Sequence, residues 1–266
     1  MTALLLGGLS VVLERSRVVE RLDVSVAAGE WVGLIGPNGA GKTTVLRAVA
    51  GLAAYEGSIR VRGDEVRTVP RRELSRRVAL VPQNPVLPPD VTVLEYVLLG
   101  RTPHVGYTGA LGARDVRISR SALGRLDAAH LADRRLGSLS GGERQRAVLG
   151  RAIAQDAGIV LLDEPTTGLD VGAQQQVLEL VASLRTGGAL TVVSAMHDLT
   201  IAGQYADRLV LMDGGREAAS GLPHEVLTEE LVARHYGASV RVVADDEAGI
   251  AVLPLRPRLE AQERIV

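Results

Sequence analysis

The chain has 266 residues, of which 46% are hydrophobic, with a formal net charge of −1 and no cysteine. These values exclude a disulfide framework and a thiolate metal site, and they give no basic footprint for nucleic-acid binding. Because no apolar stretch reaches the roughly 18–20 residues that span a bilayer and no secretion signal begins the chain, we expect one compact cytoplasmic unit with an inserted piece.

The first part of the chain predicts β-structure followed by a phosphate-binding loop. Two strands, 4–13 and 17–26, flank a charged turn, and an apolar run from Trp31 to Ile35 forms the next strand. The stretch from Gly36 to Thr44 then fits G-x-x-x-x-G-K-[ST] and leads into a helix-like run, 44–50. In this strand-loop-helix context, backbone N–H groups and the helix dipole converge on one anion.

Lys42 is the only lysine among the 30 Lys and Arg residues of the chain. A compact ammonium fits inside a tight backbone loop, whereas the wide guanidinium of arginine does not. We expect Lys42 to reach the β- and γ-phosphates of a nucleotide and the Thr43 hydroxyl to bind Mg²⁺. An accidental match in a glycine-rich turn is the alternative, and the flanking strand and helix argue against it. The loop residues expected to bind nucleotide are Gly36, Pro37, Asn38, Gly39, Ala40, Gly41, Lys42, Thr43 and Thr44.

Downstream of the loop, strand signals give way to helix signals. A proline-rich crossing follows the strand that ends at Pro82-Gln83, and helix-like runs with cap residues come after it. The predicted elements are strands 57–61 and 78–81, a helix 91–99 capped by Thr92 or Asp90, a glycine-rich loop 100–112, an amphipathic run 114–130 and a helix 141–155. We expect residues 87–154 to form a mainly helical insertion.

Strand signals return in the last part of the chain. The predicted elements are strands 159–162 and 190–194 with a helix 172–184 between them, a hairpin 209–212 and 216–220, a helix 223–236, and a tail 237–266 with two strand-like runs and a charged end. Strands that alternate with helices predict an α/β fold with a parallel sheet.

Two adjacent carboxylates, Asp163 and Glu164, close the apolar run Ile159–Leu162. The carboxyl end of a strand is the edge at which open α/β sheets bind ligands. We expect Asp163 to hold Mg²⁺ through water and Glu164 to be the general base for attack of water on the nucleotide. Because neighbouring strand residues point to opposite faces, both can serve one site only if the backbone turns, which we expect at Pro165. A charged loop after a core strand is the alternative.

The stretch from Leu139 to Glu143, Leu-Ser-Gly-Gly-Glu, begins the predicted helix 141–155. A serine and two glycines at a helix start make an anion site. Ser140 followed by Glu143 also satisfies a capping box, so a simple helix cap is the alternative, and both can hold together. One nucleotide hardly needs two cradles from one chain, so we expect this site to serve the nucleotide of a second copy.

Taken in order, these motifs resemble those of the ATP-binding subunit of an ABC transporter over residues 1 to about 236. Several motifs in one order are more specific than any single one. Gly36–Thr44 matches the Walker A loop, Gln83 the Q-loop, Leu139–Glu143 the signature, Ile159–Glu164 the Walker B strand, Thr167–Asp170 the D-loop, and His197 the switch histidine.

The resemblance implies an α/β fold: a P-loop NTPase (RecA-like) core with an antiparallel β subdomain and an inserted α-helical subdomain. It also implies a division of the chain. The ATP-binding cassette would cover 1–236, with 1–86 and 155–236 as the core plus β subdomain, 87–154 as the helical subdomain with the signature, and 237–266 as a C-terminal extension.

The same resemblance implies a Mg²⁺-dependent ATPase in which two subunits pack head to tail around two ATP molecules. The catalytic residues would be Glu164, His197, which contacts the γ-phosphate, and Gln83. The Mg²⁺ site would be formed by Thr43, Gln83 and Asp163. The second copy would contribute Ser140, Gly141, Gly142 and Asp170.

The chain departs from the family pattern at the adenine. The family usually places an aromatic ring there, and counting back from Ala28-Gly29-Glu30 puts Leu13 at that position, with Val18 as a second base contact. Loss of a ring stack of about 1 kcal/mol predicts weaker discrimination between ATP and GTP.

Three further stretches, 71–77, 91–97 and 100–104, are similar to importers of iron-siderophore, haem and cobalamin. This resemblance implies two integral-membrane permease subunits, a substrate-binding protein as an indirect partner, and a peripheral location on the cytoplasmic face of the cell membrane. The alternatives are a soluble ABC ATPase outside transport, an ABC ATPase of another transporter class, and a monomeric P-loop kinase, which would leave the Leu139–Glu143 stretch without a role.

Overall fold

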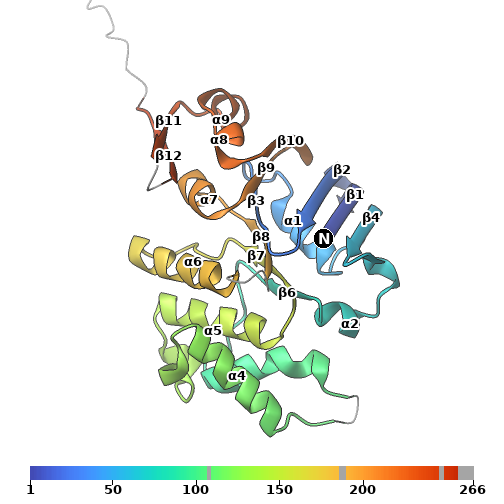
Figure 1. The fold of residues 1–266 in the computed structure, drawn as a ribbon, viewed down its shortest axis with the longest axis vertical. Helices are drawn as coiled ribbons and strands as arrows, with labels where there is room; N and C mark the ends of the chain where they lie inside the picture. The colour runs from blue at the N-terminus through green and yellow to red at the C-terminus, as the bar shows by residue number, and fades with distance from the viewer. Residues whose placement is uncertain (107–108, 186–189, 246–248, 257–266) are drawn as a thin grey trace, which may run out of the picture.

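The computed structural model of the chain describes residues 1–106, 109–185, 190–245 and 249–256, and is built around a six-stranded sheet (Figure 1). The strand order is β10-β9-β3-β8-β7-β6, and every neighbouring pair is parallel except β9 and β10. The α/β class is therefore confirmed. The strands are β3 Trp31–Ile35, β6 Val78–Val81, β7 Ile159–Asp163, β8 Thr191–Ala195, β9 Arg208–Asp213 and β10 Arg216–Gly221.

The central strands are apolar because both faces of the sheet are covered. Every residue of β3, β7 and β8 is buried, as expected for parallel strands between two layers. On one face, α1 (Lys42–Val49) packs with a second sheet, and on the other lie the remaining longer helices. The P-loop therefore leaves the sheet at the carboxyl end of a buried strand that is paired on both sides.

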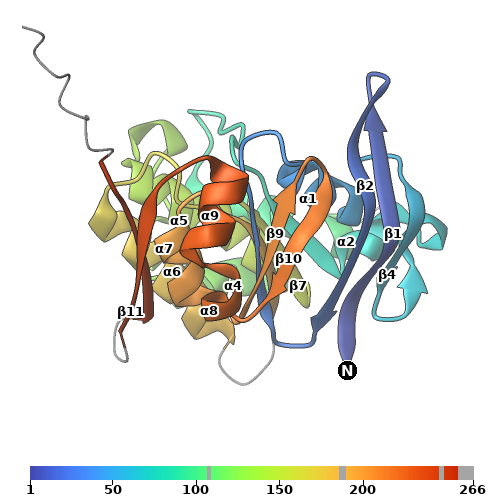
Figure 2. The same cartoon turned by 90° about the horizontal axis from the view of Figure 1, so that it is seen from above.

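The second sheet is antiparallel and has the order β2-β1-β4-β5. Figure 2 shows it to one side of the central strands, with α1 between. The predicted charged turn is confirmed, since Glu14 and Arg15 adopt positive φ between the first two strands. This sheet is the predicted antiparallel β element. Its strands are β1 Thr2–Leu13, β2 Ser16–Ala27, β4 Glu56–Val61 and β5 Asp64–Glu65, followed by a 3₁₀ turn, η1 Val66–Thr68, and by α2 Arg71–Ser75.

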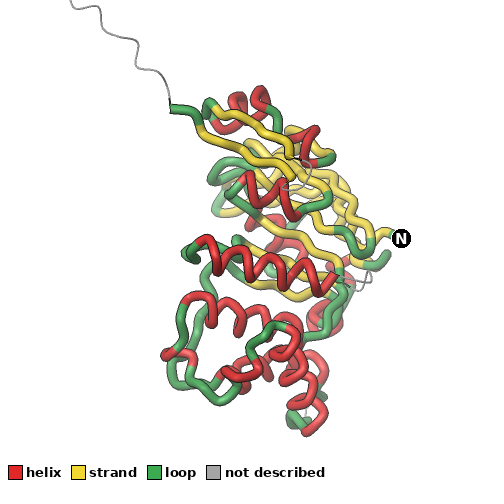
Figure 3. Tube along the Cα trace, turned by 60° about the vertical axis from the view of Figure 1, so that its left-hand side comes forward, coloured by secondary structure: helices red, strands yellow, loops and turns green. Residues whose placement is uncertain are grey.

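A helical segment follows β6 and forms one end of the molecule (Figures 1 and 3). The Thr92 cap is confirmed, because its hydroxyl accepts a hydrogen bond from the Glu95 N–H. The loop predicted at 100–112 is wrong over its first residues, which continue as a 3₁₀ helix; residues 107–108 lie outside the described residues. The boundaries at 87 and 154 stay a prediction. The elements are α3 Val93–Leu98, η2 Leu99–His104, α4 Ala113–Arg125, η3 Ala129–Leu131, η4 Leu136–Ser138 and α5 Gly141–Ala154.

The last part of the chain contains two corrections. A helix that follows His197 was not predicted, because its run of seven residues carries too short an apolar pattern. The single helix expected at 223–236 is wrong, since it ends at Val226 and Thr228 caps a new helix. The predicted charged end of the tail, 257–266, lies outside the described residues. The elements are α6 Val171–Arg185, α7 Leu199–Tyr205, α8 Pro223–Val226, α9 Glu229–Tyr236, β11 Val240–Asp245 and β12 Gly249–Pro254.

Across the described ranges, none of the helices combines the length and the apolar character that a membrane crossing requires.

Candidate functional site

The P-loop needs glycine at two positions because neighbouring backbone approaches it closely. Gly36 has φ +143°, and a Cβ there would collide with the carbonyl oxygen of Met212. Gly41, which precedes α1, has φ +96°, and its Cβ would lie 2.8 Å from the carbonyl oxygen of Val18. Both the left-handed conformation and the lack of space exclude a side chain. The loop is therefore shaped by its contacts with β9 and β2 as well as by its own sequence.

Lys42 lies inside this loop with 5% of its surface exposed. Its ammonium donates hydrogen bonds to the carbonyl oxygens of Gly36 at 2.6 Å and Pro37 at 3.1 Å. Burial lowers the pKa of Lys42, and the carboxylates of Glu164 and Asp163 oppose that shift. A buried cation bonded only to neutral carbonyl oxygens gains from exchanging them for the charged oxygens of a phosphate.

A cavity of about 400 Å³ opens in front of the loop. Residues from distant parts of the chain meet there, because the carboxyl ends of β6, β7 and β8 lie at the same edge of the sheet. The cavity is lined by Val18, Asn38, Gly39, Ala40, Gly41, Lys42, Thr43, Thr44, Gln83, Glu164 and His197. The structure therefore brings residues 38–44 of the predicted loop together with all three predicted catalytic residues, whereas Gly36 and Pro37 do not line the cavity.

Asp163 lies next to this cavity and is linked to the P-loop. The Thr43 hydroxyl donates a 2.8 Å hydrogen bond to Oδ1 of Asp163, which has 4% of its surface exposed. Burial raises the pKa of the Asp163 carboxyl, and the bond from Thr43 opposes that shift. Within the described ranges, no three His, Asp or Glu residues gather closely enough to hold a metal ion by themselves. A cation at this pair would therefore need further oxygens from a bound ligand.

Glu164 turns toward the same cavity because its own backbone reverses. It has φ +52°, which is uncommon for a side chain of this size. The turn expected at Pro165 therefore occurs one residue earlier, at Glu164 itself. A hydrogen bond of 3.1 Å from its N–H to the Ala195 carbonyl oxygen anchors this turn to β8.

The Glu164 carboxylate is 8% exposed and engages three neighbours. His197 Nε2 contacts Oε1, and the Gln83 amide donates to Oε2. The Thr167 hydroxyl donates a second bond to Oε2 at 3.1 Å. The sequence predicts Thr167 only as the first residue of the motif Thr167–Asp170. Its hydrogen bond to Glu164 was not predicted, although a spacing of three residues is typical of a turn.

The signature residues lie on a different surface. Ser140, Gly141, Gly142 and Asp170 line a cavity of about 450 Å³ that shares no lining residue with the P-loop cavity. The capping box is confirmed, because the Glu143 carboxylate accepts from the Ser140 N–H at 2.8 Å. Arg146 and Gln176, which the sequence did not single out, also line this surface. One copy of the chain therefore does not bring the signature to its own P-loop.

Of the two predicted base contacts, the structure brings one to the cavity. Val18 lines it, whereas Leu13 lies at the end of β1, outside the set of lining residues, and is 42% exposed. Contact between Leu13 and the base stays a prediction.

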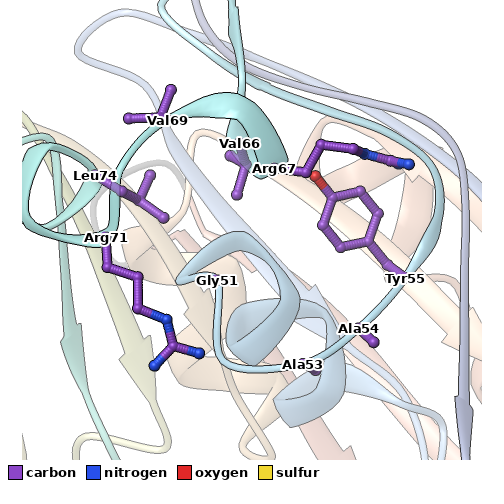
Figure 4. Close-up of a pocket in the computed structure, with 9 residues that line it drawn as sticks. All are labelled: Gly51, Ala53, Ala54, Tyr55, Val66, Arg67, Val69, Arg71 and Leu74. Atoms are coloured by element: carbon purple, nitrogen blue, oxygen red, sulfur yellow. The ribbon is translucent and has the colours of Figure 1, made fainter.

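A further cavity of about 350 Å³ lies between the loop after α1, the turn η1 and α2 (Figure 4). Leu74 and Val66 form its apolar wall, and Arg67 and Arg71 lie on different sides of it. The Arg67 guanidinium is already held over the Tyr55 ring, 4.7 Å from its centre, and pairs with Glu65 at 3.2 Å. No predicted site residue lines this cavity, so it is separate from the P-loop site.

The chain is similar to a known protein family and to several named proteins. A family profile described as ABC transporter matches residues 19–167. The hemin import ATP-binding protein HmuV of Nocardia farcinica is 43% identical over 242 residues, which cover 90% of this chain and 83% of that protein. The ferric enterobactin transport ATP-binding protein FepC of Escherichia coli is 38% identical, with coverage of 90% and 89%.

The cobalamin import ATP-binding protein BtuD of Halobacterium salinarum is 41% identical over 256 residues, and this chain spans 64% of its length. Among solved structures, an inward-facing ABC transporter assigned to the metal-chelate type has a TM-score of 0.83 and 27% identity, with coverage of 97% and 99%. An ATP-binding cassette of an ABC transporter in its ADP conformation has a TM-score of 0.80 and 25% identity, with coverage of 89% and 98%.

Proposed function

The chain belongs to the ABC transporter family, and on that basis we propose that it is the ATP-hydrolysing subunit of a membrane importer for cobalamin, haem or iron-siderophore compounds. The observation that carries this proposal is the convergence of the P-loop, Gln83, Glu164 and His197 on one cavity. The imported compound is inferred from the relatives named above. We also propose the division into a cassette, 1–236, and an extension, 237–266.

ATP would bind with its phosphates in the P-loop. The backbone N–H groups of the loop and the N-terminal end of α1 face the position of an anion. Lys42 would exchange the carbonyl oxygens of Gly36 and Pro37 for phosphate oxygens. Val18 lines the same cavity and supports a contact with the base or sugar.

The residues present also fit Mg²⁺. Thr43 and Asp163 form a hydroxyl-carboxylate pair, and Gln83 adds an amide beside it. Mg²⁺ prefers such oxygen ligands and usually keeps water and substrate phosphates in the rest of its shell. When bound, Mg²⁺ would neutralise the charge that develops on the β- and γ-phosphates.

Hydrolysis requires that Glu164 become free to accept a proton from water. In the structure both of its oxygens are engaged by His197, Gln83 and Thr167. A γ-phosphate in the cavity offers His197 and Gln83 a more highly charged partner. We infer that their transfer to the phosphate releases Oε1 of Glu164, while Thr167 keeps Oε2 in place.

Completion of the site would require a second copy of the chain. Ser140 and Gly142 lie at the start of α5 and line a cavity that shares no residue with the P-loop cavity. We propose a head-to-tail homodimer with two ATP molecules at its interface. From the cytoplasmic face of the membrane, its closing and opening would drive two integral-membrane permease subunits, with a substrate-binding protein as an indirect partner.

Asp163→Asn separates the charge of this residue from its packing. Asparagine keeps the shape and can still accept the Thr43 hydrogen bond. Because burial raises the pKa of Asp163 in the folded chain, its ionised form costs stability above that pKa, and the cost disappears as pH falls and the carboxyl is protonated. At pH 7 and without added nucleotide, we expect the variant to have a higher melting temperature than the unmodified chain. The increase should be about 2–4 °C for each kcal/mol gained in the free energy of unfolding.

The same variant should lose at least about 100-fold in kcat, because the charged oxygen facing the cation is gone. Thermal melting at pH 7 and in steps of lower pH down to the ordinary aspartate pKa of 3.8, together with steady-state ATP hydrolysis, checks both effects. Asp156→Asn, which changes an exposed carboxylate, is the control and should show neither. A melting gain that does not shrink as the pH falls to 3.8 would contradict the assignment of a buried charge.

The function is tested by purifying the tagged chain from the membranes of its own organism in detergent. We expect a polytopic permease to co-purify and to be identified by mass spectrometry, and ATP hydrolysis to rise when that permease is reconstituted with the chain. Recovery with ribosomes, DNA or a soluble regulator would favour the soluble ABC ATPase. Recovery of a permease for sugars or amino acids would agree with a transport ATPase and would overturn the proposed class of imported compound.

A further inference from the structure

Near the far end of the signature helix α5, the helical segment is held to the core by hydrogen bonds that the proposed reaction does not use. Arg72 of α2 and Arg76, which directly follows α2, each donate from Nε to the carbonyl oxygen of Pro103 in η2, both at 2.9 Å. The Gln155 amide, directly after α5, donates to the carbonyl oxygens of Ser75 at 2.5 Å and Val78 at 2.8 Å. We name these four bonds the core–helical-segment contact.

Two neighbouring bonds make this contact continuous with α5. The His104 ring lies 2.8 Å from the carbonyl oxygen of Gln155, and Arg101, with 5% of its surface exposed, donates to the carbonyl oxygen of Ala154 at 2.8 Å. A Cβ at Gly100 would collide with the carbonyl oxygen of Arg151. The turn η2 is therefore packed directly against the last turn of α5.

These bonds do not all serve the same purpose. The last carbonyl groups of any helix lack intrahelical partners, and Arg101 and His104 satisfy two of them at the end of α5. Arg72 and Arg76 differ, because they reach from the core to a carbonyl oxygen in the helical segment. A hydrogen bond from a charged guanidinium is stronger than one between neutral groups. Here two guanidinium groups donate to the same Pro103 oxygen. Their effect is to fix the helical segment relative to the core.

We propose that Arg72, Arg76 and Gln155 are positioning residues that set the direction of α5 and thereby the position of Ser140 at its start. The proposal rests on the proposed function, in which Ser140 completes the nucleotide site of a second copy. The helix α5 has 14 residues and is therefore about 21 Å long. A rotation of about 10° at its end moves its start by about 4 Å, which is more than a hydrogen bond tolerates.

The first test measures the position of the helical segment directly. The chain has no cysteine, so spin labels can be placed at Arg60→Cys on β4 and Ser121→Cys on α4, both at exposed positions. We expect the labelled chain to give a narrow distribution of distances between the two labels. The combined Arg72→Ala and Arg76→Ala variant should broaden it, and Arg72→Lys with Arg76→Lys should narrow it again, because lysine still donates to the Pro103 carbonyl.

Two controls are matched to these arginines. Arg71→Ala removes a neighbouring arginine of the same helix, which lies against the cavity of Figure 4 and forms no hydrogen bond or ion pair with the described residues. Glu73→Gln removes the charge of the other partner of Arg76, at 3.4 Å, and leaves the bonds to Pro103. Both should keep the narrow distribution. An unchanged distribution in the double alanine variant would overturn the proposal.

The second test links position to function. The second test uses the double alanine variant with Glu164→Gln added, and its parent is the chain with Glu164→Gln alone. The dissociation constant for a fluorescent ATP analogue should stay within about twofold of the parent's. The dissociation constant of the ATP-dependent dimer should rise at least about tenfold. Equal weakening of nucleotide binding and dimerisation would mean a general loss of fold and would overturn the positioning role. If the parent itself forms no dimer with ATP, the proposed function fails and this inference falls with it. A dimerising parent with an unaffected variant would refute the positioning role alone.

Discussion

Glu164→Gln lowers kcat for ATP hydrolysis by about 10²–10⁴-fold while ATP binding is retained. Glutamine keeps the size of the side chain and can still accept the Thr167 hydrogen bond, but its amide cannot take a proton from water. The left-handed backbone of Glu164 aims this side chain at the P-loop cavity, and no change of backbone is needed for the substitution. Single-turnover hydrolysis and titration with a fluorescent ATP analogue separate the two effects.

The same variant should accumulate as an ATP-bound dimer, because hydrolysis no longer reopens it. Its mass in solution with and without ATP reports this directly. Glu179→Gln is the matched control, since it changes an exposed glutamate that accepts a 3.0 Å hydrogen bond from Tyr205 far from the P-loop cavity. A kcat within tenfold of the unmodified chain would show that Glu164 is not the base. Failure to dimerise with ATP would instead favour a monomeric P-loop kinase.

Mixing two inactive variants should restore hydrolysis if each site is built from two copies. Lys42→Ala removes the cation of the P-loop, and Gly142→Asp places a negative charge on the signature surface. A side chain fits at Gly142, since its Cβ would lie 3.6 Å from Ala173 Cβ, an ordinary contact. We expect each variant alone to lose at least about 100-fold in kcat, because one of the two halves of every site is defective.

In an equal mixture, half of the symmetric dimers combine the two variants, and each of these holds one intact site. The expected recovery is therefore about one quarter of the unmodified activity. A mixture of Lys42→Ala with Asp163→Asn is the control, because both changes lie on the P-loop side and no combination rebuilds a site. Recovery in this control, or none in the first mixture, would refute a site shared between copies.

Much of the fold and of the site could be predicted because the evidence was local. The P-loop needs a strand, glycines, a lysine and a helix in one short stretch, and Gly36 to Thr44 contains all of these. The helix cap at Thr92 and the capping box at Ser140 depend on residues three apart. The buried strands β3, β7 and β8 show as short, mainly apolar runs. Each of these signals acts within a few residues.

Errors arose where the competing contact came from elsewhere in the chain. The turn was expected at Pro165 because proline is a strong local signal, yet the bond between the Glu164 N–H and Ala195 of β8 puts it at Glu164. The helix expected at 223–236 has a different, local cause of error: the Thr228 hydroxyl accepts a hydrogen bond from the Leu231 N–H and caps a second helix, a signal three residues long that the prediction missed. The short helix α7 forms where Asp198 caps its first turn and β12 packs against it.

The sequence by itself determined which chemical groups this protein has: a phosphate loop around its only lysine, a pair of carboxylates after a buried strand, and a second anion site at the start of a helix. These follow from spacing and side-chain chemistry, which are properties of the chain alone. Only the tertiary structure decided which groups meet. The sheet brings Gln83, Glu164 and His197 to the P-loop, whereas α5 carries Ser140 to another surface. The physical reason is that distances between residues far apart in sequence depend on strand order and helix packing, which no local pattern encodes.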